Sequence, residues 1–406
     1  MKKWFSNIGP GTLVTAAFIG PGTVTVCTLA GVNFGYSVLW ALVLSIIACI
    51  VLQEMAARLG IITQNGLSEV LKSQFSNKVV RWGLIIIILS AIFIGNAAYE
   101  AGNISGGVLG LSTIFGSPTI EIGTISINYM SIIIGVIAFV LLYIGNYKIL
   151  ERSLIVLVLC MSVAFIITAI VTKPDLSLLL KGFIPDFSAD KTLTIIGLVG
   201  TTVVPYNLFL HASLVSEKWK SSDDLSLARK DTIVAIVLGG LVSMAIIIAG
   251  AAIQTTEVNN AADLAKGLEP VFGSMAKYVL SMGLFAAGIT SAITAPLAAA
   301  YVVKGCLGWQ DGLKSKSFRS VWIFILLMGV LFSSLGIKSI VIIRFAQIAN
   351  GLLLPIVAVF LLWVMNQKKI LGNYTNSWKQ NLIGILILII TCFLGIRGVW
   401  KVLESM

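Results

Sequence analysis

Gly20, Pro21, Gly22 and Thr23 lie near the middle of an apolar stretch, residues 16–31 (AAFIGPGTVTVCTLAG). Proline removes one backbone donor and clashes with the preceding turn, and glycine lowers the cost of leaving helical geometry. In hydrocarbon, freed backbone groups are tolerated only where they face protein or a water-filled cavity. The pattern therefore predicts a break in a membrane-spanning helix that borders a binding cavity. A proline kink without a ligand is the alternative interpretation.

A second apolar stretch, residues 197–214 (GLVGTTVVPYNLFLHASL), carries Pro205 near its middle. The residues around this proline that we expect to border the same cavity are Thr201, Thr202, Val204, Tyr206 and Asn207. We expect about eleven spans, a helix of about 20 apolar residues being enough to cross a bilayer. The two interrupted spans are the first and the sixth. Because an odd number of spans separates their starts, two five-span halves would have inverted topology. Paired interruptions in two such halves predict a transporter site near the bilayer midplane.

The composition is that of a polytopic, all-α membrane protein. The chain has 406 residues, of which 58% are hydrophobic and 11% are charged, whereas soluble domains carry about 25% charged residues. We expect the spans near 10–34, 37–59, 82–111, 126–146, 153–172, 191–216, 231–253, 273–305, 319–336, 339–366 and 380–400. The connections are too short for a soluble domain. We therefore expect one transmembrane domain over residues 1–406, with repeats near 5–172 and 190–366 and an extra helix near 380–400.

The formal net charge of +11 is explained by membrane topology. If the N-terminus is cytoplasmic, 19 of the 28 Lys and Arg residues fall on the cytoplasmic side. An excess of basic residues in cytoplasmic loops sets orientation. We therefore predict a multi-pass protein of the cell membrane, with the N-terminus inside and the C-terminus outside. The partners that this implies are the lipid bilayer and a small solute or ion, and a nucleic-acid partner is not indicated.

Several motifs together resemble the Nramp (natural resistance-associated macrophage protein) family of divalent-metal transporters. They are GPGTLVTAAFIGPG, GYSVLWALVLSIIACIVLQEMAARLGIITQNGLSEV, KPDLSLLLKGFIP, VPYNLFLHASLV and GITSAITAPLAAAYVVKGCLGW. The resemblance covers nearly the whole chain, from about residue 5 to 400. It implies a LeuT-type fold in which spans 1–5 and 6–10 are inverted repeats and helices 1 and 6 are broken. Family members move Mn²⁺, Fe²⁺ and related ions, usually with coupling to protons.

The chain departs from the family pattern at the site itself. The first-span motif of the family reads Asp-Pro-Gly-Asn, whereas here Gly20 and Thr23 replace the acid and the amide. The sixth-span motif reads Met-Pro-His-Asn, whereas here Val204 and Tyr206 replace the thioether and the imidazole. Thr201 aligns with the alanine that contributes a backbone carbonyl in the family. A transition metal prefers imidazole, thioether or carboxylate ligands, and Mg²⁺ prefers oxygens that include carboxylates. The sequence therefore predicts no metal site of the usual kind.

Acidic residues inside the spans are few, and intramembrane ionisable groups are functional candidates by default. Glu100 lies in the third span, where the family places acids of its proton route, so a role in coupling or gating is implied. The alternative is a buried carboxyl that pairs with Asn96 or Asn103. Glu54 lies four residues before Arg58, and an i,i+4 ion pair on one helix face would explain it structurally.

His211 is the single histidine of the chain and matches the second histidine of the sixth-span family motif. The resemblance implies a proton-relay role, which the near-neutral pKa of imidazole permits. A hydrogen-bonded packing residue is the alternative interpretation. Gln347 matches a glutamine of the tenth span that can face the substrate, and Asn350 lies at i+3 from it.

These residues leave three hypotheses for the function. Half-helix N-termini near Thr23 and Asn207 offer free N–H groups and a positive dipole end, which suit an anion. The leading hypothesis is therefore a secondary transporter of a small anion, a carboxylate (bicarbonate among them) or a neutral or zwitterionic solute. The second is a divalent-cation carrier of Mg²⁺ or Mn²⁺, with or without a coupling proton or cation. The third is a non-transporting membrane sensor or partner subunit.

An enzyme is not indicated. The chain has no His-Glu-x-x-His and no Gly-x-Ser-x-Gly motif, and its single histidine argues against most metal-assisted hydrolysis. No catalytic residue and no cofactor are predicted. The five cysteines lie in apolar segments without paired spacing, which favours core packing over a disulfide framework or a zinc site.

Overall fold

The fold was analysed in a computed structural model of the chain. The structure describes residues 19–74, 77–116, 119–122, 125–145, 148–253, 258, 260–309, 312 and 314–404. The first half of the expected first span, residues 1–18, lies outside the described residues.

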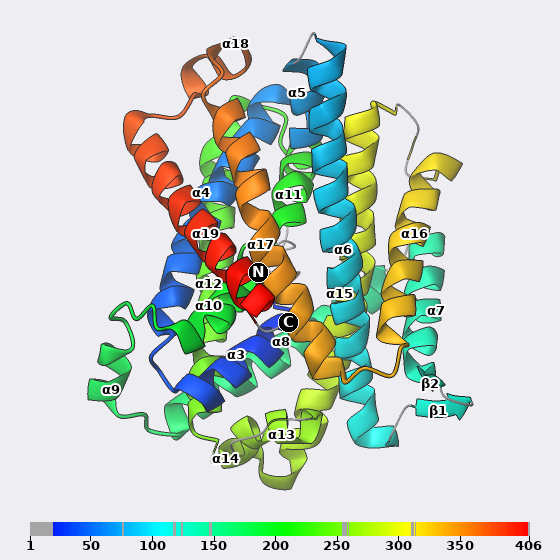
Figure 1. Ribbon diagram of the computed structural model, residues 1–406, viewed down its shortest axis with the longest axis vertical. Coiled ribbons are helices and arrows are strands. Elements are labelled where there is room, and N and C mark those ends of the chain that lie inside the picture. Colours follow the sequence, from blue (N-terminus) through cyan, green and yellow to red (C-terminus); the bar gives the residue numbers. More distant parts are fainter. Residues whose placement is uncertain are drawn as a thin grey trace.

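The molecule is a helical bundle whose long helices run between two polar ends (Figure 1). Within the described residues, nine helical stretches are long and apolar enough to cross a membrane, and α7 is a shorter apolar helix. The helices that correspond to the expected spans are α3 (Pro21–Phe34), α4 (Leu39–Thr63), α6 (Lys78–Phe115), α7 (Tyr129–Ile144), α8 (Lys148–Val171), α10 (Thr192–Thr202) with α11 (Pro205–Lys218), α12 (Leu225–Ala251), α15 (Ala276–Leu307), α16 (Lys316–Ser333), α17 (Ser339–Met365) and α19 (Trp378–Glu404).

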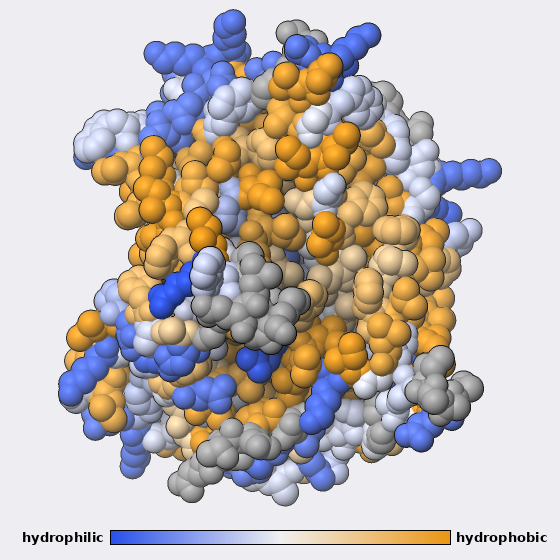
Figure 2. All heavy atoms as spheres, viewed as in Figure 1, coloured by the Kyte–Doolittle hydropathy of each residue, from blue (hydrophilic) through white to orange (hydrophobic). Residues whose placement is uncertain are grey.

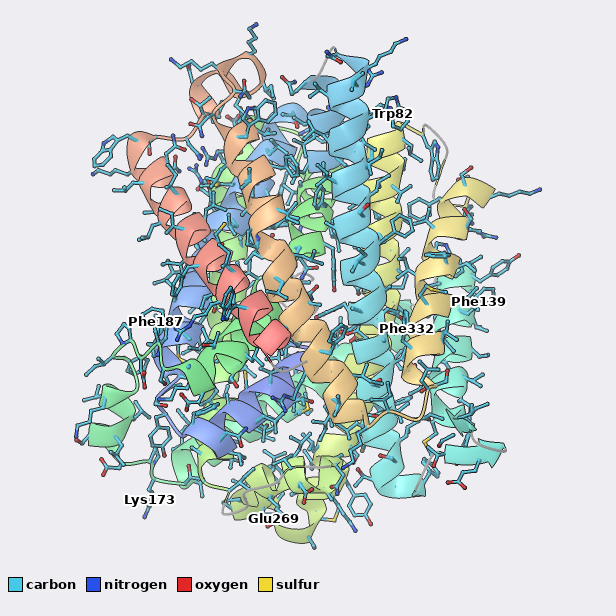
Figure 3. The ribbon with its side chains drawn as sticks, in the orientation of Figure 1. Trp82, Phe139, Lys173, Phe187, Glu269 and Phe332 are labelled. Carbon is cyan, nitrogen blue, oxygen red and sulfur yellow. The ribbon has the colours of Figure 1, made fainter. Side chains whose placement is uncertain are left out.

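Short elements connect these helices at the two ends of the bundle. One end carries α5 (Leu67–Gln74) and α18 (Lys368–Leu371), and the other carries α9 (Leu176–Lys181), α13 (Ala261–Ala265) and α14 (Glu269–Phe272) (Figure 1). Lys173 and Glu269 lie at this second end, whereas Trp82 lies near the first (Figure 3). By the positive-inside argument, the α5–α18 end is the expected cytoplasmic side.

A small hairpin was not expected from the sequence. Strand β1 (Thr119–Ile122) pairs antiparallel with β2 (Ile125–Asn128) just before α7. The Asn128 N–H donates to the Ser334 carbonyl at 3.0 Å, so the hairpin joins α7 to the end of α16. A two-stranded hairpin is marginal by itself, so this contact with α16 supports it. Polar and apolar residues alternate in TIEI and ISIN, and residues 126–128, which were expected in the fourth span, belong to β2.

The surface between the two ends is apolar. Figure 2 shows hydrophobic residues over the middle of the bundle and hydrophilic residues gathered at its ends. Large side chains in this belt are exposed, among them Phe139 at 38% and Phe332 at 45% (Figure 3). In water such an apolar surface would be unusual for a monomer. The belt therefore has the character of a lipid-facing surface, in agreement with the composition.

The predicted ion pair between Glu54 and Arg58 is confirmed, with Nη2 of Arg58 at 3.0 Å from Oε2 of Glu54. The pair belongs to a larger network. Arg229 of α12 donates from Nε to Oε1 of Glu54 at 2.8 Å. Arg58 also donates to the Tyr374 carbonyl at 2.9 Å and to Oδ1 of Asn376 at 2.8 Å. One carboxylate therefore links α4 to α12, and its arginine links α4 to the α18–α19 connection.

Candidate functional site

The described part of the first span begins as a helix directly after the predicted break. Gly20 is the N-cap of α3, in an extended conformation, and Pro21 is its first helical residue. Proline suits this position because it has no N–H that would need a partner. The first intrahelical bond runs from the Val24 N–H to the Gly20 carbonyl at 3.2 Å. The N–H groups of Gly22 and Thr23 therefore lie in the first turn, where a helix has no internal acceptors for them.

The sixth span is broken in the same way. Helix α10 ends at Thr202, and α11 begins at Pro205 after Val203 and the extended residue Val204. Val204 is the buried N-cap of α11, and its carbonyl accepts from the Asn207 N–H at 3.1 Å. The predicted interruption of this span is thus confirmed.

The two broken helices meet through two threonine hydroxyls. Oγ1 of Thr23 on α3 lies 2.8 Å from Oγ1 of Thr201 on α10, and both side chains are fully buried. Thr202 behaves differently, because its hydroxyl donates to the Leu198 carbonyl of its own helix at 2.8 Å. Thr23 and Thr201 are therefore the hydroxylated residues that connect the two half-helices.

Gln347 of α17 lies against both half-helices. A Cβ atom added at Gly22 would lie 2.1 Å from Nε2 of Gln347. A Cβ atom added at Gly200 would lie 1.9 Å from the Gln347 carbonyl oxygen. Both distances are far below van der Waals contact. At Gly200 the clashing atom belongs to the backbone of α17, so only glycine leaves room there, whereas at Gly22 the Gln347 side chain would have to turn away. The structure thus places Gln347 at the break, next to the first turn of α3.

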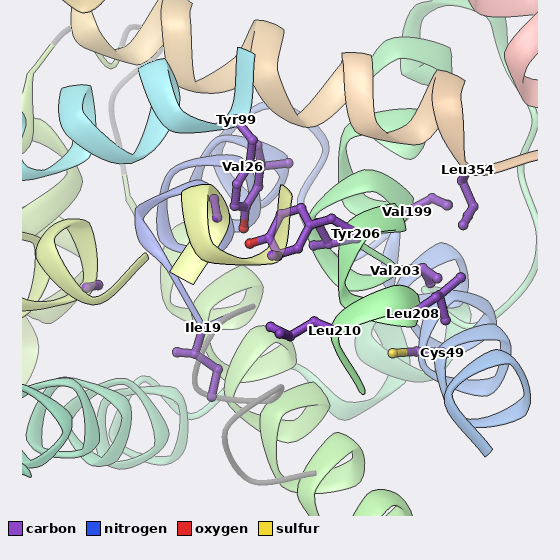
Figure 4. Packing of buried hydrophobic residues seen from close by; sticks show 14 of the residues in the cluster. Ile19, Val26, Cys49, Tyr99, Val199, Val203, Tyr206, Leu208, Leu210 and Leu354 are labelled. Atoms are coloured by element: carbon purple, nitrogen blue, oxygen red, sulfur yellow. The ribbon is translucent and has the colours of Figure 1, made fainter. Parts of the chain in front are cut away.

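Tyr206 occupies the start of α11 and is fully buried. Its ring contacts the ring of Tyr99 on α6, with centroids 5.4 Å apart and the planes inclined at 67°. The two hydroxyl groups point toward one another (Figure 4). Tyr99 was not among the sequence candidates, because a single aromatic residue in an apolar helix carries no distinguishing pattern. Edge-to-face pairs of this kind also stabilise packing.

Three side chains around the break have buried polar atoms without a hydrogen-bond partner among the described residues. These atoms are the hydroxyl of Tyr206, Oδ1 of Asn207 and Oε1 of Gln347. Most buried polar side-chain atoms in proteins are satisfied by protein or ordered water. Unsatisfied groups that come from two elements, α11 and α17, at a helix break are what a site for a small polar solute would present.

The side chain of Glu100 makes contacts with α16 and with its own helix, α6. Its side chain packs against Gly329 of α16, where an added Cβ would lie 2.3 Å from Cγ of Glu100. Its Oε2 accepts a long hydrogen bond of 3.4 Å from Nδ2 of Asn103, whereas Asn96 donates to the Ala295 carbonyl. Its Oε1 has no partner among the described residues. The side chain of Glu100 therefore extends from α6 toward α16. Its role in coupling stays a prediction.

His211 contacts α4 and α12, and not Thr23 or Thr201. Its Nδ1 lies 2.8 Å from Oε1 of Gln53 on α4, and its Nε2 lies 3.5 Å from Oγ1 of Thr232 on α12. The imidazole thus connects α11 to two neighbouring helices. This arrangement fits the packing interpretation, and it leaves the proton-relay interpretation untested.

The His211–Gln53 hydrogen bond gives a first testable prediction. We expect the double variant His211→Leu/Gln53→Leu to be less destabilised than the sum of the two single variants, by about 0.5–1.5 kcal/mol, because each single variant leaves the other polar group buried and unpaired. The measurement is a double-mutant cycle on thermal unfolding in detergent. Strictly additive effects would show that the two side chains do not interact.

Metal ligands of the usual kind do not gather within the described residues. No group of three or more His, Cys, Asp and Glu side chains there is arranged to hold a metal ion. Residues 1–18 contain no acidic residue and no histidine or cysteine. The polar groups brought together around the break are therefore hydroxyls, amides and backbone N–H groups.

Comparison with known proteins gives the family. The model of the family described as natural resistance-associated macrophage protein-like matches residues 11–401. The chain belongs to the Nramp family. A divalent metal cation transporter, MntH of Caldanaerobacter subterraneus, is 25% identical over 400 residues, which is 95% of this chain and 91% of that protein. The chain is therefore a membrane transporter of this family, and the relatives that it matches are named as transporters.

Solved structures agree on the fold of this Nramp-family chain. A mutant of the manganese transporter of Eremococcus coleocola matches with a TM-score of 0.77 at 21% identity, over 98% of this chain and 87% of that one. MhsT in complex with L-phenylalanine matches with a TM-score of 0.62 at 15% identity, over 98% of both chains. The expected LeuT-type fold is thus confirmed. The names of the metal-transporting relatives agree with the second hypothesis, a divalent cation, and give no support to a small anion.

Proposed function

We propose that this Nramp-family transporter carries a small carboxylate-like anion, with bicarbonate as the first candidate, by alternating access around the two broken helices. One observation carries the proposal. Where the family has an acid and an amide, this chain has Gly20 and Thr23, and Thr23 is joined to Thr201 at the first turn of α3. The first turn of a half-helix, with the positive end of the helix dipole and hydroxyls beside it, is suited to oxygen atoms that carry negative charge.

The charge of the site supports the same proposal. Moving a divalent cation out of water is strongly unfavourable unless anionic ligands compensate it. The groups around the break are neutral, and the two half-helices turn the positive ends of their dipoles toward it. A small anion would instead gain from both dipoles and from hydrogen bonds to the hydroxyls of Thr23 and Thr201. The predicted neutral or zwitterionic solute would gain from the same groups through its own oxygens.

A divalent cation is the second candidate. Relatives named as divalent metal cation transporters support it, and so do the unpaired amide oxygens of Asn207 and Gln347. Oxygen ligands without charge suit a largely hydrated ion, and Mg²⁺ keeps several of its waters in many sites.

The proposal also keeps the predicted topology, with the N-terminus inside and the C-terminus outside, and the repeats near 5–172 and 190–366.

Uptake into proteoliposomes tests the substrate. We expect saturable uptake of labelled bicarbonate at alkaline pH, above the leak of protein-free liposomes, and no saturable uptake of Mn²⁺ or Mg²⁺. Thr23→Val should lower bicarbonate uptake about tenfold, the effect of losing one hydrogen bond to an ion of about 1.5 kcal/mol. Thr202→Val is the matched control, because the Thr202 hydroxyl bonds within its own helix, and it should stay close to the parent.

Two other results would overturn the proposal. Saturable Mn²⁺ or Mg²⁺ uptake that collapses in Thr23→Val, without bicarbonate uptake, would establish the cation carrier. No uptake of any solute, together with no rise of the thermal midpoint on adding bicarbonate, small carboxylates, amino acids or metals, would favour the non-transporting sensor, since a ligand of the native state raises that midpoint.

A further inference from the structure

A narrow cavity lies between α3, α10 and α17, on the side of the break that faces the α9–α14 end. Its lining residues are Val26, Leu29, Asn33, Leu193, Thr194, Gly197, Arg344 and Ile348. The space inside is about 10 Å³, which is room for about one water molecule. Asn33, Thr194 and Arg344 supply its polar lining.

The cavity lies one helical turn outside the broken-helix site on all three helices. Val26 follows Thr23 by one turn on α3, and Gly197 precedes Thr201 by one turn on α10. On α17, Arg344 precedes Gln347 by three residues. Three residues along a helix are about 4.5 Å. The cavity and Arg344 therefore lie between the residues of the helix break and the expected outer side.

Arg344 is the charged residue of this cavity, and it has no counter-ion there. Its side chain is exposed, and the described residues supply it with no hydrogen-bond or ion-pair partner. No acidic side chain is among the eight lining residues. Its position near the start of α17 gives it no benefit from the helix dipole, which favours cations at the C-terminal end. The structure offers no stabilising contact that would explain an arginine here.

We propose that Arg344 selects the substrate by charge at the outer entrance, attracting a small carboxylate-like anion and repelling divalent cations. The proposal rests on the anion transport proposed above and adds a residue that determines specificity. A guanidinium is charged at all relevant pH values and its N–H groups match a carboxylate or bicarbonate oxygen pair. In a narrow cavity with low-dielectric walls, one charge raises the local concentration of the opposite charge.

The test is the bicarbonate concentration dependence of uptake at low and at high ionic strength. In Arg344→Gln we expect the half-saturating concentration to rise about tenfold at low salt, the lower end of electrostatic focusing, while the maximal rate stays near that of the parent. At high salt the half-saturating concentration of the parent should rise toward that of Arg344→Gln, because salt screens an exposed charge. At low salt, Arg344→Lys should have a half-saturating concentration close to that of the parent.

Lys277→Gln is the matched control. Lys277 is an exposed basic residue near the α9–α14 end, where α15 begins, and it does not line the cavity. If Lys277→Gln behaves like Arg344→Gln, or if Arg344→Gln leaves the half-saturating concentration of an anion-transporting parent unchanged, the role of Arg344 is overturned while anion transport stands. If the parent takes up no anion, both proposals fail together.

Discussion

Replacing Gly200 by alanine is expected to abolish most transport. The added Cβ would lie 1.9 Å from the Gln347 carbonyl oxygen and 2.6 Å from the Gly351 nitrogen. Both atoms belong to the backbone of α17, so no side-chain rotation can relieve the clash. Helix α10 would have to move away from α17, and Thr201, the next residue, would move with it.

This displacement of α10 would lower both the rate of transport and the stability of the protein. Overpacking of a well-packed core costs about 1–3 kcal/mol, and a displacement of about 1 Å at a positioned group can reduce a rate about a hundredfold. We therefore expect bicarbonate uptake by Gly200→Ala to fall by at least tenfold, with a lower thermal midpoint in detergent. Gly395→Ala on α19 is the matched control, because a Cβ at position 395 would meet Leu352 at an ordinary 4.0 Å. Equal uptake by both variants would contradict the packing described here.

The second large effect is expected for Glu54→Gln. Glu54 is the carboxylate between two arginines, and the Arg58 side chain is 2% exposed. Removing one partner of a buried pair leaves an uncompensated charge, which costs about 3–5 kcal/mol when burial is complete. Glu54 is 14% exposed and Arg229 is 42% exposed, so the charge left behind is partly solvated. We therefore expect the free energy of unfolding to fall by about 2–4 kcal/mol, seen as a fall of several degrees in the thermal midpoint.

An ion pair whose cation is far more exposed than Arg58 provides the comparison for Glu54. Asp263 pairs with Lys266 at 2.9 Å, and the lysine side chain is 41% exposed. Exposed pairs of this kind contribute about 0–1 kcal/mol. Asp263→Asn should therefore leave the midpoint nearly unchanged, and a shift as large as that of Glu54→Gln would show that burial of Arg58 is not what makes the network costly to break.

Much of the fold was predictable because membrane spans are long and strongly apolar. The expected span 339–366 is α17 (Ser339–Met365), and the expected break at Pro205 is the start of α11. The i,i+4 pair of Glu54 and Arg58 could also be predicted, since both partners share one helix face. The contact of Arg229 with Glu54 could not be predicted, because the two residues are 175 positions apart in the sequence.

The site was predictable in location more than in detail. Proline and glycine in two apolar spans identified where the helices break, and the matching glutamine identified Gln347. Which polar groups stay free depended on tertiary packing. Thr202 was grouped with Thr201, yet its hydroxyl bonds to Leu198. Tyr99 was missed, because its importance comes from the ring of Tyr206 on a different helix.

The contact between Gly22 and Gln347 limits how this chain can have diverged from its relatives. Any side chain at position 22 would occupy the space of the Gln347 amide, so a substitution there survives only if position 347 becomes smaller or turns away. Descendants of this chain that gain a side chain at position 22 should therefore either change position 347 or turn the Gln347 side chain away. A lineage that keeps the glutamine in this orientation has to inherit the glycine with it.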